Sequence, residues 1–153
     1  MEFKHFRGPA FRIDVPTDWF VGATPQFQAI FQAPVVRQGI QPNLTVAVRP
    51  VKPEVVATAV AAQTRDVQEK EYPGYQVLTE YDYTPEGGIA VQRLYQWQQN
   101  GVGILQLQVF VVVAQLLYTL TATRPADDDP DLDAVFAQMV QSFQPQLPLV
   151  RPD

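Results

Sequence analysis

The stretch VGILQLQVFVVVAQLLYTLTAT (residues 102–123) holds two predicted β-strands in one of the most apolar parts of the chain. Side chains alternate between the two faces of a strand, so each strand divides into two sets. In the first strand one set is apolar and includes Leu107 and Val109, whereas the other includes Gln106 and Gln108. Valine suits a buried strand better than glutamine does. We therefore expect one face of the sheet to be polar but uncharged.

The composition limits the classes of protein to consider. The chain has 153 residues, 46% of them hydrophobic, which is typical of one globular domain. The formal net charge of −5 argues against nucleic acid and anionic membrane surfaces as partners. There is no cysteine, so thiolate catalysis, cysteine-ligated zinc and disulfides are excluded. Because residues 1–16 lack an apolar leader, and because no run of about 18 apolar residues occurs, we expect a cytoplasmic protein without direct membrane insertion.

Alternating apolar residues bounded by proline or glycine predict the strands. Asn100–Gly101 is typical of a tight hairpin, and we expect the last three strands to form an antiparallel meander. Gly87–Gly88 belongs to a predicted turn. The predicted strands cover residues 11–15, 26–33, 43–49, 75–84, 89–99, 104–113 and 116–123.

Two segments read as helices. Residues 52–72 are rich in alanine, with Pro53 suited to the first helical position. Residues 127–143 have Asp129 as the predicted N-cap and Pro130 after it. The predicted stripes are Val56, Val60, Gln63 and Val67 on the first helix, and Leu132, Val135, Phe136, Met139, Val140 and Phe143 on the second.

These elements predict an α+β fold, in which an antiparallel sheet of about six to seven strands is sandwiched with two main helices. We expect one domain over residues 1–145 and a proline-rich tail over residues 146–153.

The two faces of the predicted sheet differ in chemistry. One face is apolar and should form the core, covered by a helix: Leu44, Val46, Val48, Leu105, Leu107, Val109, Val111, Val113, Leu116, Tyr118 and Leu120. The other face lacks Lys, Asp and Glu. It is either a solvated face or a groove for an apolar partner, since uncharged amides cost less to desolvate than charges. Its predicted members are Gln28, Ile30, Gln32, Asn43, Thr45, Ala47, Gln92, Leu94, Gln96, Gln98, Ile104, Gln106, Gln108, Phe110, Thr119, Thr121 and Thr123.

Catalytic and metal sites find little support. A Ser/His/Asp triad would need Ser142 and His5, the single serine and histidine, which stand near opposite ends of the chain. The acidic run DDDPDLD (residues 127–133) lacks the glycine turn and closing glutamate of a calcium loop, and acidic residues favour a helix N-terminus. We expect no catalytic residue, no metal and no cofactor. The aromatic residues Tyr81, Tyr83, Tyr95 and Trp97 are typical of strand packing.

The motifs FRIDVPTDW, YPGY, LYQWQQNG, LQVF and LYTLTAT, followed by a helix that ends in SF, resemble the DcrB-like family. That family has the fold of the photosystem PsbP proteins and the Ran-binding Mog proteins, which implies an α/β/α sandwich. The stretches YQWQQNGVGILQLQVF and LLYTLTATRPAD are most similar to the Eag chaperones of type VI secretion.

The resemblance implies a dimeric, non-enzymatic chaperone that shields the hydrophobic N-terminal segment of a secreted effector and helps to load it onto the secretion apparatus. By position it implies a partner-binding role for Ile30, Tyr72 and Gln108. A family glutamine falls at Thr64, beside Gln63, and a family aliphatic position falls at Gln28. The strand alternation adds Gln106, so the expected site is Gln28, Ile30, Gln63, Thr64, Tyr72, Gln106 and Gln108.

Two other functions stay open at this point. A PsbP-like accessory subunit of a membrane-associated complex shares the expected fold. A small hydrolase would have to use His5 or the acidic run of residues 127–133.

Overall fold

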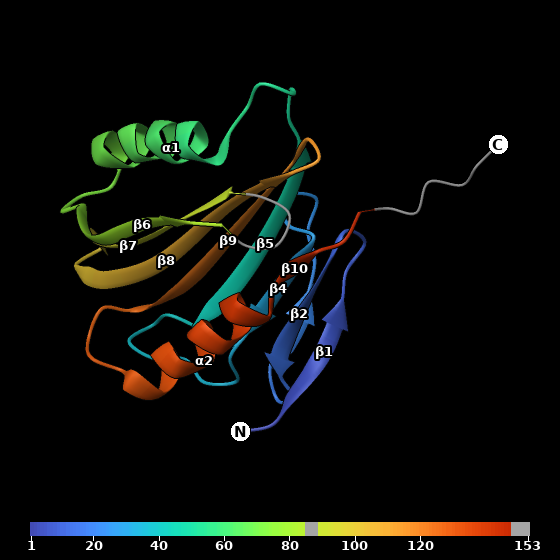
Figure 1. The fold of residues 1–153 in the computed structure, drawn as a ribbon. Coiled ribbons are helices and arrows are strands. Elements are labelled where there is room, and N and C mark those ends of the chain that lie inside the picture. The colour runs from blue at the N-terminus through green and yellow to red at the C-terminus, as the bar shows by residue number, and fades with distance from the viewer. Residues whose placement is uncertain (85–88, 148–153) are drawn as a thin grey trace.

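The main sheet is antiparallel and has seven strands in the order β3-β4-β5-β9-β8-β7-β6 (Figure 1). It is seen in a computed structural model that describes residues 1–84 and 89–147. The turn predicted at residues 85–88 and most of the predicted tail lie outside the described residues. The strands are β3 (Phe20–Gly22), β4 (Ala29–Gln32), β5 (Asn43–Pro50), β6 (Gln76–Tyr83), β7 (Ile89–Gln99), β8 (Val102–Val113) and β9 (Leu116–Pro125).

Two tight hairpins join β7, β8 and β9 into the predicted meander, which is confirmed. Asn100 and Gly101 have φ values of 52° and 79°, the left-handed conformation that a two-residue hairpin loop needs. Ala114 and Gln115 make the second turn with φ values of 49° and 63°, although neither is glycine. Each turn leaves the residues on either side of it directly paired across the two strands.

A second, three-stranded sheet has the order β1-β2-β10 and was not predicted. The strand expected at residues 11–15 is confirmed but lies in this small sheet and not in the main one. The short strands β1, β3 and β10 escaped prediction because they have few residues and weak alternation; β3 is exposed along its whole length. The strands of the small sheet are β1 (Phe3–Arg7), β2 (Phe11–Pro16) and β10 (Gln144–Pro145).

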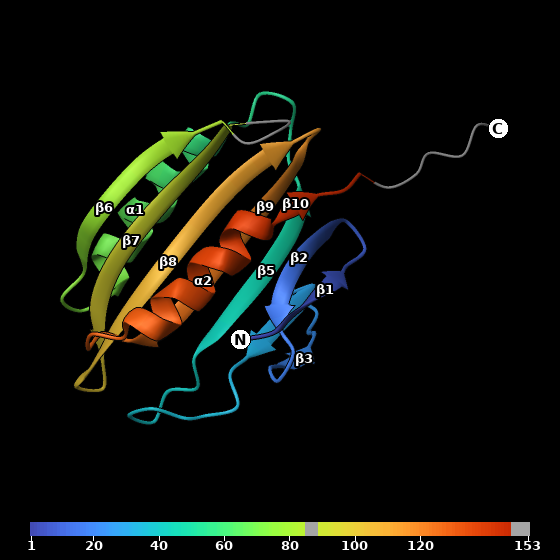
Figure 2. The same ribbon diagram turned by 60° about the horizontal axis from the view of Figure 1, so that its bottom comes forward.

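Helix α2 (Pro130–Ser142) and the small sheet cover one face of the main sheet, over β4, β5 and β9 (Figure 2). The predicted apolar stripe is confirmed, since Leu132, Val135, Phe136 and Met139 are buried. They pack with residues of β2, β5 and β9 in the larger of two hydrophobic clusters. The predicted cap is also confirmed, because the Asp129 carboxylate accepts a hydrogen bond from the backbone N–H of Leu132.

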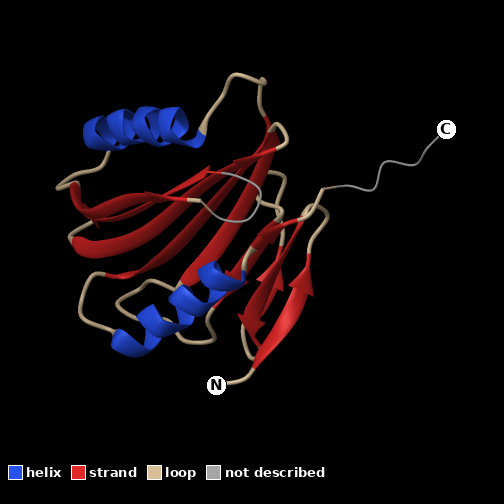
Figure 3. Ribbon diagram, viewed as in Figure 1, coloured by secondary structure: helices blue, strands red, loops and turns tan. Residues whose placement is uncertain are grey.

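Helix α1 (Ala57–Glu71) lies on the opposite face of the main sheet, over β7 and β8 (Figure 3). It begins at Ala57 and not at Pro53, because Val56 is still extended and residues 52–55 form a turn. Ala57 and Ala61 are buried against Val91, Phe110 and Leu117 in the smaller cluster. Small side chains let this helix approach the sheet closely.

The valine stripe predicted on α1 lies beside the buried face of the helix and does not form it. Val56 and Val67 are 51% and 48% exposed, whereas Ala57, Ala61 and Gln68 are buried. Alanine and glutamine contribute little to a hydrophobic pattern, so the valines dominated the sequence signal.

The two helices therefore cover different halves of the main sheet on its two faces, and the opposite halves stay open. On the α1 face the open part lies over β9 and β5, and on the α2 face it lies over β6 and β7. The expected α+β sandwich is confirmed, and this offset determines where a partner can reach the sheet.

The cap of α2 can be tested by two substitutions of Asp129. Asp129→Ala removes the acceptor of the Leu132 N–H and should lower the free energy of unfolding by about 1 kcal/mol. Asp129→Asn keeps an acceptor and loses only the ion pair with the half-exposed Arg37, so it should cost less. Urea denaturation measures both; equal losses would show that the ion pair, and not the cap, stabilises this end.

Candidate functional site

Hydroxyl and amide side chains form the open floor of the main sheet on the α1 face. Thr121 on β9 lies between Thr45 on β5 and Gln108 on β8, each directly paired with it. In the next row Thr123 lies between Asn43 and Gln106. The uncharged face predicted from the alternation of β5, β8 and β9 is confirmed.

Hydrogen bonds run across the strands along the second of these rows. The indole N–H of Trp97 donates to the Gln106 amide oxygen at 2.9 Å, and the Gln106 amide nitrogen donates to the Thr123 hydroxyl oxygen at 3.0 Å. A hydroxyl that accepts a hydrogen bond still has its own hydrogen to donate. Thr123 therefore offers a donor to whatever lies above the floor.

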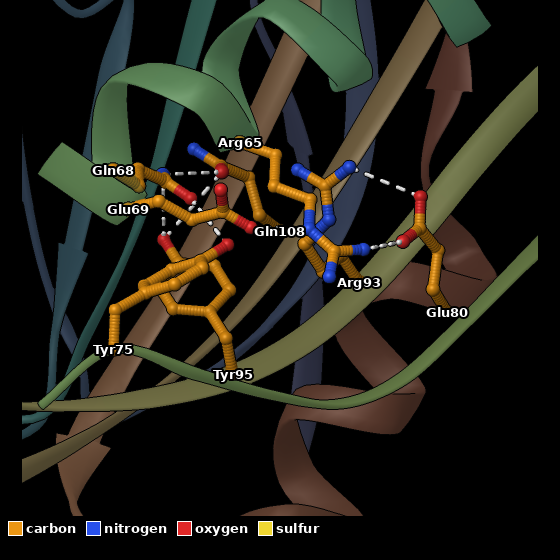
Figure 4. Close-up of polar contacts among 8 residues, drawn as sticks. All are labelled: Arg65, Gln68, Glu69, Tyr75, Glu80, Arg93, Tyr95 and Gln108. Carbon is orange, nitrogen blue, oxygen red and sulfur yellow. Dashed lines mark hydrogen bonds and ion pairs between the residues drawn. The ribbon is translucent and has the colours of Figure 1, made fainter.

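The first row joins the floor to α1 through Gln108, as Figure 4 shows. The Gln108 amide nitrogen donates to the Thr121 hydroxyl at 3.1 Å, and its oxygen accepts from Gln68 of α1 at 3.0 Å. The Tyr75 hydroxyl donates to the Gln68 amide oxygen at 3.0 Å, and the Tyr95 hydroxyl lies within 3.4 Å of both amides. Gln68 and Gln108 are thus buried with partners, and α1 is held by hydrogen bonds as well as by alanines.

A charged branch holds the other side of α1, towards β6 (Figure 4). Arg93 of β7 is 1% exposed and donates to the Glu80 carboxylate at 3.0 Å. Arg65 of α1 reaches the other oxygen of that carboxylate at 3.3 Å and pairs with Glu69. The Arg93 Nε and Nη1 atoms find no partner among the described residues, so Glu80 alone compensates the buried charge.

A hollow of about 390 Å³ lies above the open floor. At one end the Tyr72 ring, which follows α1, stacks on Trp97 with 4.2 Å between ring centroids. None of the lining residues within 1–84 and 89–147 is charged. They are Gln26, Phe27, Asn43, Thr45, Ala47, Tyr72, Tyr95, Gln106, Gln108, Thr119, Thr121 and Thr123. We name this hollow, with the flank of α1 beside it, the α1 groove.

Valines along one side of α1 and at its N-cap form that flank: Val56 and Val67 are 51% and 48% exposed, and Val60 is partly buried. Successive residues of a helix are rotated by about 100°. Gln68 faces the sheet, and Arg65 turns towards β6, where it meets Glu80. The residues turned away from β6, and so towards β9 and β5, are Val56, Val60, Gln63 and Val67.

Three of the predicted site residues, Gln106, Gln108 and Tyr72, line the groove together. Ile30 lies further out on the same face, since it pairs with Thr45. Gln28 precedes β4, where its backbone N–H donates to Val46 and its amide oxygen is buried without a partner among the described residues. The remaining two lie on α1: Thr64 is half-buried and Gln63 is exposed.

The face predicted for β7 is wrong. Tyr95 pairs with Gln106 and Arg93 with Gln108, so these odd-numbered residues share the α1 face. The hairpin at Asn100–Gly101 sets this register, which the alternation within β7 alone does not reveal. The residues that belong to the α2 face are Gln92, Leu94, Gln96 and Gln98.

Arg93, Tyr95 and Gln68 also belong to the site, although they were not predicted as parts of it. The hairpin signal would have placed the first two, because a two-residue loop pairs odd with even positions here. Gln68 carried no signal, since glutamine on a helix is most often solvated.

Ser142 and His5, the residues considered for catalysis, contact other groups and not each other. The Ser142 hydroxyl donates to the Met139 carbonyl and accepts from the Asp14 backbone N–H, both at 2.8 Å. The His5 imidazole contacts the Asp14 carboxylate and is 93% exposed. Within residues 1–84 and 89–147, no group of three or more His, Asp or Glu side chains is placed to hold a metal ion. Over the same residues, no helix has the length and apolar character needed to cross a membrane.

Removing Glu80 should destabilise the protein strongly. Glu80→Gln leaves Arg93 charged and buried, so the free energy of unfolding should fall by about 3 kcal/mol. Adding Arg93→Met should restore most of that loss, because no buried charge remains. Glu69→Gln is the matched control; its exposed pair with Arg65 should contribute less than about 1 kcal/mol. Urea denaturation of the wild type and the three variants measures these differences, and a double variant no more stable than Glu80→Gln would contradict this account.

The stability of the protein should fall above pH 10. Burial raises the pKa of Tyr95 well above its ordinary value of 10.0. The unfolded chain then loses this proton near pH 10 while the native protein keeps it, so unfolding becomes easier as pH rises. In Tyr95→Phe the free energy of unfolding should fall less steeply above pH 10. Tyr81→Phe, which changes a half-exposed tyrosine, is the control and should leave the fall as it is in the wild type. Parallel declines in the wild-type and Tyr95→Phe proteins, measured by denaturation at a series of pH values, would exclude this linkage.

Several solved structures share the fold. The cyanobacterial PsbP protein of Synechocystis has a TM-score of 0.70 at 15% identity, over 94% of this chain and 92% of that one. LpqN of Mycobacterium tuberculosis, involved in cell envelope biogenesis, has a TM-score of 0.74 at 16% identity, over 95% and 91%. The Ran-binding protein Mog1p of Saccharomyces cerevisiae has a TM-score of 0.64 at 9% identity, over 94% and 95%. At these identities the likeness shows the fold, and it confirms the expected PsbP/Mog-like sandwich.

Sequence comparison gives a closer relationship. Effector EagT6 of Pseudomonas aeruginosa is 36% identical over 92 residues, which make up 59% of this chain and 62% of that protein. The match therefore spans less than two thirds of that relative's length. The DcrB family model matches residues 29–142, which include the floor of the α1 groove and both helices. The chain belongs to the DcrB family, as its motifs indicated.

Proposed function

We propose that this chain is a non-enzymatic chaperone that binds an apolar, transmembrane-like helix of a secreted effector in the α1 groove. It would shield the helix in the cytoplasm and aid its loading onto a type VI secretion apparatus. The observation that carries the proposal is the lining of the groove, in which amides, hydroxyls and aromatic rings occur without a charge.

The lining suits a partner that is mostly apolar but carries some small polar side chains. Burying an apolar helix against a charged face would leave ions without water, whereas uncharged groups cost much less to desolvate. The floor of Thr45, Ala47, Thr119 and Thr121 has small side chains, which let a helix approach the sheet. The exposed valines of the α1 flank add apolar contact along the side of the bound helix.

Hydrogen bonds would then select and orient the partner. Thr121 and Thr123 accept from glutamines and keep hydrogens to donate. Small polar side chains that pair across packed helices make the same kind of contact inside membranes, at about 1 kcal/mol each. The partner helix should therefore carry small and hydroxyl residues on the face that meets the floor.

The relationships support the same reading. The similarity to Effector EagT6 favours an effector as partner, and the Eag-like motifs favour a homodimer as the working state. The likeness to the cyanobacterial PsbP protein concerns the fold alone, so it does not favour the accessory-subunit alternative.

Capture of an effector segment tests the proposal. The chain is co-expressed with the tagged N-terminal region of each protein encoded beside it, and the complex is purified and its mass measured. We expect one apolar segment to be captured and Ala47→Glu, which places a carboxylate in the floor, to weaken its binding by tenfold or more, at about 1.4 kcal/mol per factor of ten.

Ala59→Glu makes the same change on the exposed side of α1 and should bind as the wild type does. Thermal unfolding of both variants shows that the fold is intact. The proposal fails if no apolar segment is captured, or if Ala47→Glu captures the segment as well as Ala59→Glu.

A further inference from the structure

The α2 face of the sheet carries a second groove, which the proposed function leaves unused. Two hollows of about 560 and 410 Å³ lie between α2 and strands β6, β7 and β8. They share Tyr81, Gln92, Val140 and Gln141, so they form one continuous depression. Each lies in the size range of ligand sites in proteins. We name this depression the α2 trough.

The trough is more apolar than the α1 groove. Its floor includes Leu94 and Leu107, which are half-buried, and its outer rim includes Leu78 and Tyr81, which are 42% and 50% exposed. Exposed apolar side chains that gather around one depression are typical of an interaction site. The predicted apolar core face is therefore only partly covered by α2, and the rest remains accessible.

Negative charge gathers at one end of the trough. Asp128 and Asp133 line it beside the first turn of α2, and Asp127 and Asp131 lie next to them. Arg124 is the one cation among the described lining residues and is 5% exposed.

Arg124 already uses four of its five N–H donors within the protein, and its charge is paired with Asp133. Its guanidinium donates to both carboxylate oxygens of Asp133, at 2.7 and 3.0 Å, and to the carbonyl oxygens of Pro125 and Asp127. Asp128 makes no ion pair within the described part of the chain. At the other end of the trough, near Tyr83 and Phe143, none of the lining residues that the structure describes is charged. The trough is thus apolar along its length and acidic at one end.

We propose that the α2 trough binds a short apolar peptide segment that carries Lys or Arg at the end lying over the N-terminal turn of α2. The side chains would fill the two hollows, and the basic end would meet Asp128. From Asp133 to Gln141 the trough follows α2 for about 12 Å, the length of about two helical turns. The site lies on the opposite face from the α1 groove and stands apart from the proposed chaperone function.

Charge distinguishes this occupant from a second copy of the chain. The chain has a formal net charge of −5, so the acidic end of the trough does not attract a second copy, and the proposed homodimer would use another surface. A basic segment instead gains from the acidic end, and that gain should weaken as salt is added.

The test uses two fluorescent peptides with the same core of about twelve alternating leucine and alanine residues, long enough to span the trough. One ends in a pair of lysines and the other in a pair of glutamates. Fluorescence anisotropy with the full chain should show the lysine peptide binding about tenfold more tightly, with the difference shrinking at high salt.

Matched variants locate the site. Ala137→Glu places a carboxylate in the trough and should weaken binding of either peptide about tenfold, whereas Ala134→Glu, on the same helix outside the lining, should not. Asp128→Asn should reduce the preference for the lysine peptide, and Asp131→Asn, outside the lining, should reduce it less. If Ala137→Glu fails to fold by circular dichroism, Leu78→Glu on the exposed rim of β6 replaces it.

Each contrary result overturns the proposal in a recognisable way. Equal affinity for both peptides would show that the acidic end does not select the peptide. Equal binding by Ala137→Glu and Ala134→Glu would show that the peptide does not bind in the trough. Loss of binding in Ala47→Glu alone places the peptide in the α1 groove, which leaves the chaperone proposal standing. A change of molecular mass in Ala137→Glu without a change in peptide binding makes the trough a contact between copies of the chain.

Discussion

The two-residue turn at Asn100–Gly101 is the constraint on which the rest of the α1 face depends. Both residues have positive φ, so the strands must leave the turn with Gln99 paired to Val102. That register places Arg93 and Tyr95 beside Gln108 and Gln106, and it turns the glutamines of β7 to the other face. A register shifted by one residue would put those glutamines under α1 and expose the arginine. The second turn, at Ala114–Gln115, carries the same alternation into β9.

Patterns that repeat within one element predicted the structure well. The alternation in β5, β8 and β9 identified the threonine and glutamine face, and the apolar stripe and aspartate cap identified α2. The face of β7 could have been deduced from the turn, but it was assigned from the alternation of that strand alone. The wrong result shows that alternation gives two sets of side chains, and only the pairing between strands says which set shares a face with a neighbour.

Features that depend on contacts between distant segments could not be predicted from local pattern. The small sheet forms because β10 returns to β2 from the far end of the chain, and two residues carry no periodicity. Arg93 is buried because Glu80, on the neighbouring strand, and Arg65, on α1, meet above it. The buried side of α1 consists of alanines and a glutamine, which a hydrophobic pattern cannot distinguish from a solvated surface. The offset of the two helices, which opens a polar groove on one face and an apolar trough on the other, also follows from tertiary packing.

The two hydrophobic clusters lie on opposite faces of the main sheet and differ greatly in size. The larger contains α2, both sheets and most of the buried aromatic rings, whereas the smaller joins α1 to the sheet through a few alanine and aliphatic side chains. Regions with few buried apolar contacts open at a lower free energy than the whole protein unfolds. We therefore expect α1 to detach from the sheet at a lower free energy than α2. Its amide hydrogens should exchange with solvent sooner than those of α2, and each detachment would widen the groove from one side.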